Sequence, residues 1–599
     1  MRWKLRQAAP ERVHSLAGEL RTLPYVSAHP ALAETLARLL VLRGIDFAEA
    51  ARAFLSPALA HLHSPYLMTG LKAAIERLEM AIERKERVLI FGDYDVDGTA
   101  AVVILKTAVE LAGGSAEFHV PHRIREGYDL RGDLIERAAA AGIRLVVTVD
   151  AGTRAFAAAE SARRTGVDLI ITDHHLPGQD GLPQAYAVVN PNQAGCGYPC
   201  KSLCAAGIAL KLAQALLEKR LAHRDQSQLL LSFMKIAAIA TVADAVPLVG
   251  ENRVIASLGL DALRAAVNPG LKALLEVAEL AGRPLRSGEV AFRIAPRINA
   301  AGRMDVARDV IDLFAVKDAA KAQEIAERLD QLNHQRQEEE RRILDAIEQR
   351  LTELPVLREA FALVIDGDGW HRGVIGITAK RIVDRYRRPT LVVAADGEEA
   401  HGSGRSIPGF HLLNALESCS ELFTRYGGHA QAVGFSLPSA RVPELRARFD
   451  QYARAHLSAV DFEPVVEIDA ELELAEITPE LFRLIGMLEP FGTGNPEPVF
   501  RTTARLIAPP KLLKQRHVRL KLGPDAEENA GQGWRRSLTY SAMGWRLAEA
   551  TAEAKLLAGD ILNLAFTIDC NQHPEFGGLE LAVRDFERAV AAKGARSGT

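Results

Sequence analysis

The stretch Phe91-Gly-Asp-Tyr-Asp-Val-Asp-Gly98 places three carboxylates on alternate residues directly after an apolar run at 88–91. Acids this close repel one another unless a cation lies between them. The carboxyl end of a predicted strand is where an open α/β sheet places its ligands, and carboxylate oxygens suit Mg²⁺ or Mn²⁺. The stretch suggests a metal-dependent phosphate chemistry, although on its own an acidic turn on a solvated surface would be the commoner explanation.

The bulk composition is that of a folded, soluble chain. A length of 599 residues is too great for one core, so we expect three or four domains. A formal net charge of -3 gives no global signal for nucleic acid, so any basic binding surface must be local. The five cysteines make no disulfide framework, and the N-terminus shows no signal peptide. We therefore expect a cytoplasmic protein without a membrane span.

Three of the cysteines recur at four-residue steps, at Cys196, Cys200 and Cys204. A structural zinc site normally uses four ligands, and Pro199 interrupts the series. The spacing favours small core or loop residues over a zinc site.

Short β-branched runs alternate with Ala-rich helical segments between residues 85 and 250, at 88–91, 116–120, 145–149 and 169–172. This alternation predicts βαβ units and a mainly parallel sheet. Residues 1–80 read instead as short amphipathic helices, which we expect to pack on the catalytic domain.

Acids and imidazoles follow three of these predicted strands. The aspartates of 93–97 follow the first, Asp150 follows the third, and Asp173-His174-His175 follow the fourth. Taken alone, Asp150 is explained equally well as a helix N-cap as by a metal-binding role. Taken alone, the histidine pair is explained equally well as loop residues without a role. Together they predict a metal site along one edge of the sheet.

A fourth contribution is Asp244, within the apolar stretch 237–248. An ionised carboxylate in such surroundings costs several kcal/mol unless a cation or a donor compensates it. A bound metal would do so directly.

Four motifs in this order resemble motifs I to IV of the DHH phosphoesterase superfamily: Asp-Tyr-Asp-Val-Asp-Gly (93–98), Val-Thr-Val-Asp (147–150), Asp-His-His (173–175) and Thr-Val-Ala-Asp (241–244). Within that superfamily the chain is similar to the RecJ family of single-strand-specific 5′ to 3′ DNA exonucleases, over nearly its whole length. Further matching stretches lie at 121–128, 295–303, 332–337, 370–376, 427–431 and 488–495.

The resemblance implies an α/β protein: a parallel-sheet DHH domain joined by a long helix to an α/β DHHA1 domain, followed by a C-terminal OB-fold β-barrel. The segment 319–351 has apolar residues at helical spacing and no Pro or Gly, which predicts one helix about 50 Å long. The expected domains are an N-terminal helical region (1–80), DHH (81–315), linker helix (316–352), DHHA1 (353–458) and OB-fold (459–599).

The second half contains glycines beside polar groups at 401–406 and 427–429. Glycines let backbone N–H groups approach a phosphate, and Arg binds one bidentately. The spacing alone is weak evidence against ordinary turns, and the resemblance to a DHHA1 domain strengthens it.

The last 140 residues or so predict short strands at 465–469, 518–522, 538–540, 562–566 and 579–583, which suit an OB-fold that binds single strands. This region is locally basic through Lys511, Lys514, Arg516, His517, Arg519, Lys521, Arg535 and Arg536.

Six ligands can hold two divalent ions, Mn²⁺ or Mg²⁺, when one carboxylate bridges them. Asp150, on the central strand, is the candidate bridge. By resemblance the metal ligands are Asp93, Asp95, Asp97, Asp150, His174 and Asp244. Their division between the two ions stays open.

Most members of the superfamily have a histidine four residues before the first Asp of the Asp-x-Asp pair. That position is Phe91 here, so we expect Asp93 to substitute. Asp150, His174 and His175 are the expected catalytic residues, with His175 contacting the scissile phosphate or the leaving group.

Recognition of a 5′ end requires a terminal-phosphate pocket, and Arg is the residue best shaped for it. By resemblance Ser403, Arg405 and Ser406, with Arg297 or Arg303, form this pocket. The expected substrate-binding set is Arg297, Asn299, Arg303, Ser403, Arg405, Ser406 and His429.

The expected activity is hydrolysis of single-stranded DNA from its 5′ end to mononucleotides, in DNA repair and recombination. The resemblance also implies a single-strand-binding protein and a helicase as partners, and we expect a monomer. Two alternatives stay open: a DHH phosphodiesterase of pyrophosphate, short oligonucleotides or cyclic dinucleotides, and a non-catalytic Cdc45-like replication scaffold. The first would not need the C-terminal barrel, and the second should have lost metal ligands.

Overall fold

The structure is a computed structural model that describes residues 1–123, 125–127, 129–221, 225–304, 307–524, 539–571 and 577–589. The chain forms two compact units. One combines Met1–Ser56 with Pro464–Thr599, and the other is Pro57–Glu463.

The larger unit begins with a five-stranded, all-parallel sheet of order β3-β2-β4-β5-β6. Its strands are β2 (Arg87–Gly92), β3 (Ser115–His119), β4 (Leu145–Val149), β5 (Asp168–Thr172) and β6 (Ala187–Val189). The four predicted strands are confirmed, and β6 was not predicted.

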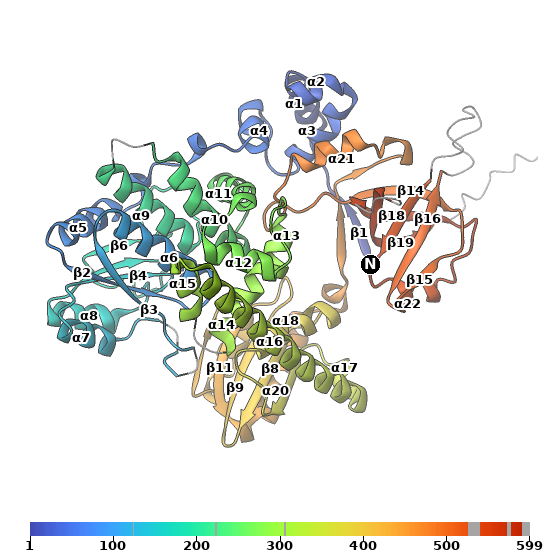
Figure 1. Cartoon of the computed structure of the whole chain (residues 1–599). Helices are drawn as coiled ribbons and strands as arrows, with labels where there is room; N and C mark the ends of the chain where they lie inside the picture. Colours follow the sequence, from blue (N-terminus) through green and yellow to red (C-terminus); the bar gives the residue numbers. More distant parts are fainter. Residues whose placement is uncertain are drawn as a thin grey trace, which may run out of the picture. The chain divides into compact units, whose positions relative to one another are not determined.

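Helices cover both faces of this sheet (Figure 1). One face packs against α5 (Leu71–Glu83), α6 (Val96–Leu111), α9 (Ala205–Arg220) and α10 (Ser227–Ala243), and the other against α7 (Gly132–Ala140) and α8 (Phe156–Thr165). Alternate strand residues supply each core: Val88 and Ile90 point to the first layer, Leu89 and Phe91 to the second. This is the predicted doubly covered parallel sheet.

The strand order contains one reversal. The chain passes from β2 to β3 on one side and then returns to β4 on the other. In such sheets the crevice outside the carboxyl ends of the strands flanking the reversal is the usual ligand site. The fold therefore directs a ligand to the ends of β2 and β4.

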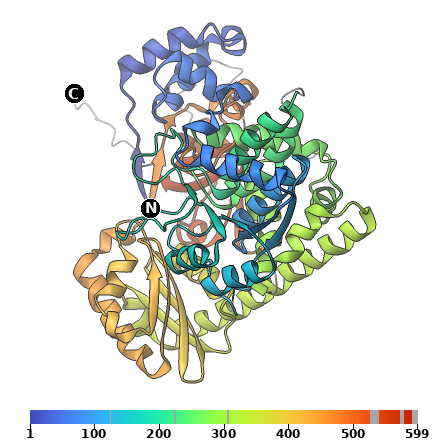
Figure 2. The same ribbon diagram turned by 90° about the vertical axis from the view of Figure 1, so that its left-hand side faces the viewer.

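After the sheet come α11 (Gly250–Ala262), α12 (Pro269–Val277), α13 (Ser287–Glu289), α14 (Ala295–Met304), α15 (Arg308–Ala315) and the long α16 (Ala319–Glu353). Asp318 caps α16 by accepting a hydrogen bond from the Lys321 N–H at 2.8 Å. Figure 2 shows α16 as one unbroken helix. The prediction of a long helix here is confirmed.

A second sheet follows α16, with order β10-β11-β9-β8-β7. It consists of β7 (Leu363–Asp368), β8 (Thr390–Asp396), β9 (Glu399–Arg405), β10 (Arg425–Gly428) and β11 (Ala432–Pro438). Only the β7–β8 pair is parallel. The helices of this part are α17 (Pro355–Glu359), α18 (Ile375–Tyr386), α19 (Leu412–Glu417) and α20 (Val442–His456).

The glycine-containing segment 401–406 is mostly strand rather than a turn, because 401–405 belong to β9. A Cβ on Gly402 would lie 2.0 Å from the Phe435 ring, and one on Gly404 would lie 2.5 Å from the Leu391 side chain. These two glycines therefore make room for core side chains. Close packing accounts for both glycines, and the expectation that they bring backbone close to a phosphate stays a prediction.

The smaller unit contains a seven-stranded sheet of order β13-β14-β18-β19-β17-β16-β15, closed by an additional β14–β16 pairing. Its strands are β13 (Ala470–Glu471), β14 (Phe500–Leu506), β15 (Lys511–Leu513), β16 (His517–Gly523), β17 (Tyr540–Gly544), β18 (Ile561–Asn571) and β19 (Gly578–Arg588). Closure of the sheet agrees with the predicted barrel, but the strand predicted at 465–469 lies outside this sheet and pairs with residues 2–5 instead. Leu538, Arg535 and Arg536 lie outside the described residues.

The prediction that residues 1–80 pack on the catalytic domain was wrong for residues 1–56. Their helices α1 (Pro10–Leu20), α2 (Pro24–Ala28), α3 (Ala33–Val41) and α4 (Ala48–Leu55) share a core with α21 (Pro479–Gly486) and the barrel strands. In addition, β1 (Arg2–Leu5) pairs with β12 (Val465–Ile468), and Arg43 donates to the Asn495 side chain at 2.7 Å. The apolar faces of these short helices are buried within the smaller unit.

Among the described residues, no helix combines the length and hydropathy needed to cross a membrane.

Candidate metal centre and phosphate pocket

The predicted metal ligands of the larger unit come from three strand ends and one helix end. Asp93 follows β2, Asp150 follows β4 and His174 follows β5 by two residues, while Asp244 is the C-cap of α10. The strand ends lie at the reversal in strand order, as expected for a sheet of this type. A carboxylate at a helix C-terminus faces the negative end of the helix dipole, so Asp244 gains from a nearby cation.

The loop after β2 is shaped by its own acids. Asp95 caps α6, accepting from the N–H groups of Asp97 at 2.9 Å and Gly98 at 3.1 Å. A Cβ on Gly98 would lie 2.5 Å from the Asp93 carbonyl oxygen, so only glycine fits there. The loop thus turns tightly enough to bring all three carboxylates to the strand end.

Asp97 is anchored by a second helix. Its two carboxylate oxygens accept from the N–H groups of Ala205 at 2.7 Å and Ala206 at 2.8 Å, in the first turn of α9. A helix N-terminus stabilises a negative charge. Each oxygen keeps a further lone pair for a metal.

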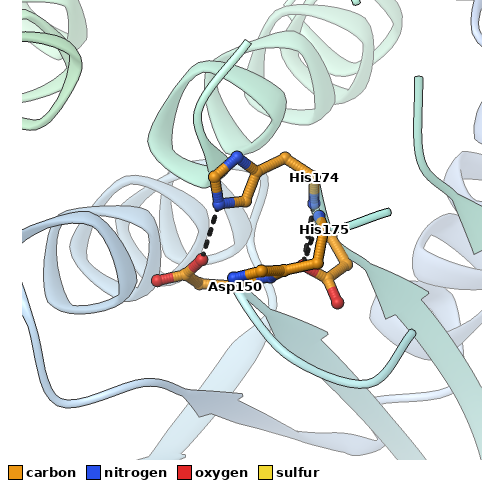
Figure 3. A group of neighbouring side chains, drawn as sticks. Asp150, His174 and His175 are labelled. Atoms are coloured by element: carbon orange, nitrogen blue, oxygen red, sulfur yellow. Dashed lines mark hydrogen bonds and ion pairs between the residues drawn. The ribbon is translucent and has the colours of Figure 1, made fainter. Parts of the chain in front are cut away.

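Asp150 has a left-handed backbone conformation, with φ 60°. A non-glycine residue in this region costs on the order of 1 kcal/mol or more and is commonest at functional sites. The turn is held by the Thr148 hydroxyl, which donates to the Ala151 carbonyl at 2.7 Å. The strain directs the carboxylate of Asp150 toward His174 (Figure 3).

His174 lies among three of the acids. Its Nε2 is 3.2 Å from Asp150 and 3.8 Å from Asp97, and its Nδ1 is 3.9 Å from Asp244. The six predicted ligands form two sets of three, each with ligand atoms within 4.8 Å of one another: Asp93, Asp95 and Asp150, and Asp97, His174 and Asp244. The structure therefore brings all six together, and the 3.2 Å contact joins the two sets.

The electrostatics of the cluster fit divalent cations. Burial, and next the charge of Asp95, raises the pKa of Asp93 to about 8. Burial, and next Asp97, raises the pKa of Asp244 to about 8 and the pKa of Asp150 well above its ordinary value. Within the described residues the buried Oδ1 of Asp93 has no hydrogen-bond partner. Crowded acids with raised pKa values, one of them with an unpaired buried oxygen, are what two hard cations would compensate.

Asp173 has a role that was not predicted from the sequence. It accepts hydrogen bonds from the N–H of Thr153 at 2.9 Å, from the N–H of His174 at 2.8 Å and from Nδ1 of His175 at 2.7 Å. Although burial opposes it, the bond to Asp173 raises the pKa of His175 to about 9. Asp173 therefore orients His175 and keeps it protonated.

The two histidines are also held through their backbones. Asn190 donates to the His175 carbonyl at 2.8 Å, and Asn192 donates to the His174 carbonyl at 2.7 Å. Both asparagines follow β6, the strand that was not predicted. Without that strand the sequence offered no signal for their role.

Strand β9 carries two of the predicted phosphate-binding residues on one face. Alternation along this strand puts Ser403 and Arg405 on one face and Gly402 and Gly404 on the other. Ser406 is buried and donates to the Phe410 carbonyl at 2.7 Å. The strand thus presents Ser403 and Arg405, while the hydroxyl of Ser406 is engaged with the backbone.

Three arginines influence one another in this region. Burial, and next the charge of Arg123, lowers the pKa of Arg303 to about 10, and the same two causes lower the pKa of Arg405. Arg123 stacks over the Tyr94 ring of motif I, 5.0 Å from its centroid. Half-buried guanidinium groups that repel one another suit an anion. Arg123 lies in the matching stretch 121–128, but no role was predicted for it.

The other predicted substrate residues differ in their contacts. Arg297 is paired with Asp330 of α16 at 2.8 Å, whereas Arg303 donates to the Gly373 carbonyl at 3.0 Å. Asn299 accepts from the Val96 N–H of motif I at 3.2 Å. Burial and then the charges of Arg405 and His175 lower the pKa of His429, so His429 lies within electrostatic reach of both. The geometry favours Arg303 over Arg297 for the pocket.

The three cysteines at four-residue steps lie just before α9, and the candidate metal groups of the described residues contain none of them. All five cysteines of the chain are free thiols.

Three segments match known protein families. Residues 87–241 match the DHH family, N-terminal domain. Residues 358–455 match the DHHA1 domain, and residues 468–585 match the RecJ OB domain.

Two similar proteins share a name. The single-stranded-DNA-specific exonuclease RecJ of Bacillus subtilis is 38% identical over 501 residues, which are 83% of this chain and 61% of that protein. Its namesake in Dickeya dadantii is 36% identical, over 76% of this chain and 82% of that protein.

Among solved structures, RecJ from Thermus thermophilus in complex with Mn²⁺ matches with a TM-score of 0.81 and 28% identity, covering 98% of this chain and 80% of that one. The sequence, the three domain matches and the fold agree, and the chain belongs to the RecJ family.

Proposed function

We propose that this chain is a metal-dependent exonuclease specific for single-stranded DNA, which removes 5′-mononucleotides in the 5′ to 3′ direction during DNA repair and recombination. One observation carries the proposal. A group of buried and half-buried acids and a group of half-buried arginines lie in one compact unit, where the charge of Arg123 helps to lower the pKa of Arg303 and partly offsets the rise in the pKa of Asp93. Similar proteins are named single-stranded-DNA-specific exonucleases.

Two divalent ions, Mn²⁺ or Mg²⁺, would be held by the two ligand sets, Asp93, Asp95 and Asp150, and Asp97, His174 and Asp244. When bound, such ions supply an activated water and neutralise charge on the phosphate. We propose that Asp150 is shared between them, because its 3.2 Å contact with His174 links the two sets.

The side chains around the ions have separate tasks. His175, protonated through its bond to Asp173, would donate a hydrogen bond or a proton to the oxygen that leaves the scissile phosphate. Asp173 keeps its ring in place, and Asn190 holds its backbone carbonyl. Catalysis would therefore depend on the Asp173–His175 pair as well as on the metal ligands.

The 5′ to 3′ direction of hydrolysis would come from recognition of the 5′ end by the arginine pocket. Ser403, Arg405 and Arg303 offer a hydroxyl and two guanidinium groups, which suit a terminal 5′-phosphate. Asn299 and His429 would contact the strand between this pocket and the ions.

The barrel of the smaller unit has a face suited to single strands. Strand pairing places Lys511 opposite Arg519, and the exposed Trp545 lies edge-on to His517 with ring centroids 4.9 Å apart. Like charges directly opposite destabilise a sheet, and exposed aromatic rings stack on bases. We propose that this face holds the strand downstream of the cleavage site.

We propose a DHH domain at 81–315, a linker helix at 316–352, a DHHA1 domain at 353–458 and an OB-fold at 459–599. The free thiols fit a reducing, cytoplasmic location. From the resemblance to the family we also propose that the protein is a monomer and that it acts together with a helicase and a single-strand-binding protein.

The test is a time course on 5′-labelled single-stranded DNA with Mn²⁺ or Mg²⁺, alongside matched duplex DNA, short RNA and a cyclic dinucleotide. We expect labelled mononucleotide as the first product from single-stranded DNA alone. Hydrolysis restricted to short or cyclic substrates would overturn the proposal, as would inertness on all of them.

A further inference from the structure

The buried face of α16 changes character half-way along the helix. Its first part is apolar and joins the core of the first sheet, through Ala322, Ala326, Leu329 and Leu332. Its last part joins a core of the second sheet, through Ile343, Ile347 and Leu351. Between these two cores the buried residues are Asn333, Arg336 and Glu340. Buried polar groups weaken a helix interface unless they are paired.

These three side chains are paired across two helices. Glu340, 2% exposed, accepts from Arg336 at 2.6 Å and from Arg381 of α18 at 3.4 Å, and it also forms an ion pair with the Nε of Arg381. Arg336 donates in addition to Asn333 at 2.7 Å. A single buried carboxylate therefore joins α16 to α18.

Each neighbour of α16 leads to one part of the site. The first turn of α18 lies against the arginine pocket, because a Cβ on Gly376 would be 2.9 Å from the Ser403 hydroxyl and 3.2 Å from the Arg405 guanidinium. Helix α14 packs along α16 and touches motif I, because a Cβ on Gly302 would be 2.3 Å from the Tyr94 carbonyl oxygen. Helix α16 thus packs against one helix that contacts the pocket and another that contacts motif I of the metal site.

We propose that Glu340, together with Arg336 and Arg381, is a positioning residue that fixes the separation between the metal ligands and the terminal-phosphate pocket. This inference rests on the proposed function. Apolar helix faces tolerate small shifts, whereas a charge-assisted, hydrogen-bonded group holds one register. A 5′-phosphate in the pocket places the first phosphodiester at the ions only when that separation is constant. Glu340 therefore serves the use of the 5′-phosphate rather than hydrolysis as such.

The chain contains a matched control. Arg385 and Glu348 form a second ion pair between the same two helices, where their side chains are 59% and 37% exposed. The test compares wild type with Glu340→Gln and Arg381→Ala, and with the control variants Glu348→Gln and Arg385→Ala.

Three quantities are measured for each variant. They are the ratio of kcat/KM on 5′-phosphorylated over 5′-hydroxyl single-stranded DNA, hydrolysis of the p-nitrophenyl ester of thymidine 5′-monophosphate, and binding of both oligonucleotides in EDTA. We expect Glu340→Gln and Arg381→Ala to lower the ratio about 10- to 100-fold, the size expected for a small misplacement. Ester hydrolysis needs the metal centre alone and should stay close to wild type, as should both control variants. Arg381→Lys, which keeps the charge, should recover part of the ratio.

An unchanged ratio in Glu340→Gln and Arg381→Ala would overturn the inference. An equal loss on all substrates, the ester included, would also overturn it, because it would show a general structural role. If Glu340→Gln does not fold, Arg381→Ala decides, since that side chain is 56% exposed. A wild type that hydrolyses nothing would contradict the proposed function instead, and binding in EDTA would still test the positioning of the pocket.

Discussion

The two charged regions of the larger unit share one physical signature with opposite signs. At the ends of β2 and β4, burial raises the pKa of Asp93, Asp150 and their neighbours. Around β9 and α14, burial lowers the pKa of Arg405 and Arg303. In both places like charges lie close together in partly or fully buried positions, which is unfavourable until a ligand arrives. A phosphodiester accompanied by divalent cations supplies both missing charges.

The largest effect should follow from removing the candidate bridge. Asp150→Ala should lower hydrolysis of single-stranded DNA by at least about 10,000-fold, the scale seen for central catalytic residues. Binding of single-stranded DNA, measured in EDTA by fluorescence anisotropy, should change little, because the arginines and the barrel face are intact. Retained turnover in this variant would contradict the two-ion assignment.

The variant Asp93→Ala tests the acidic region while Asp150, the candidate bridge, is kept. Asp93→Ala should weaken Mn²⁺ binding by about 10- to 100-fold at one of two sites, because the set of Asp93, Asp95 and Asp150 loses a ligand. Isothermal titration gives the stoichiometry and the affinity, with Asp133→Ala on the exposed start of α7 as a control. Two ions bound with native affinity would show that Asp93 does not replace the histidine of the superfamily.

Arg405 tests the basic region. Arg405→Ala should lower the preference for 5′-phosphorylated over 5′-hydroxyl ends by about 10- to 100-fold, since hydrogen bonds between charged groups contribute about 1.5–3 kcal/mol. Arg441→Ala is the matched control, because Arg441 pairs with Glu444 on the surface of the same domain. The assay is a competition between the two substrates, and an equal rate loss on both would count against a terminal-phosphate pocket.

The barrel face should contribute a smaller effect. Trp545→Ala should weaken binding of long single-stranded DNA about 10-fold, because one base loses its stacking partner. Leu512→Ala removes an equally exposed side chain that pairs with Val518 and should have no such effect. Cleavage of a trinucleotide should be alike in both variants. Comparable loss on the trinucleotide would place Trp545 outside the strand path.

The smallest expected effect is the response of stability to pH. Because their pKa values rise from 3.8 to about 8, Asp93 and Asp244 bind more protons in the native than in the unfolded chain between these values. The free energy of unfolding of the metal-free protein should therefore fall as pH rises through this window. Divalent ions bind the ionised form, so Mn²⁺ should raise Tm by a few degrees more at about pH 8 than at about pH 6. A calorimetric increment that is independent of pH would contradict the raised pKa values.

The features that were predictable from sequence are local ones. The strands β2 to β5 and helix α16 show their own hydrophobic periods, and the acids of motif I follow directly from the end of β2. Strand β9 was missed because its glycines carry no side chain to show a pattern. Only the tertiary fit of Phe435 and Leu391 explains them.

Other features depend on partners that are distant in sequence. The helical spacing of apolar residues in 1–56 predicted a buried face. It did not indicate that this face is buried in the smaller unit. Arg297 and Arg303 lie on the same helix, α14. Only the orientation of that helix in the fold shows that Arg297 pairs with Asp330. The role of Asp173 likewise depends on a side chain that turns back to Thr153 and His175.

The central claim is that the two ligand sets each hold one divalent ion, beside an arginine pocket for the terminal phosphate. The most direct measurement is anomalous diffraction at the manganese edge, from crystals grown with Mn²⁺ and a 5′-phosphorylated, non-hydrolysable oligonucleotide. We expect two anomalous peaks, one among Asp93, Asp95 and Asp150 and one among Asp97, His174 and Asp244, with the 5′-phosphate beside Arg405. A single peak, a peak outside these sets, or a terminal phosphate remote from Arg405 would contradict the account.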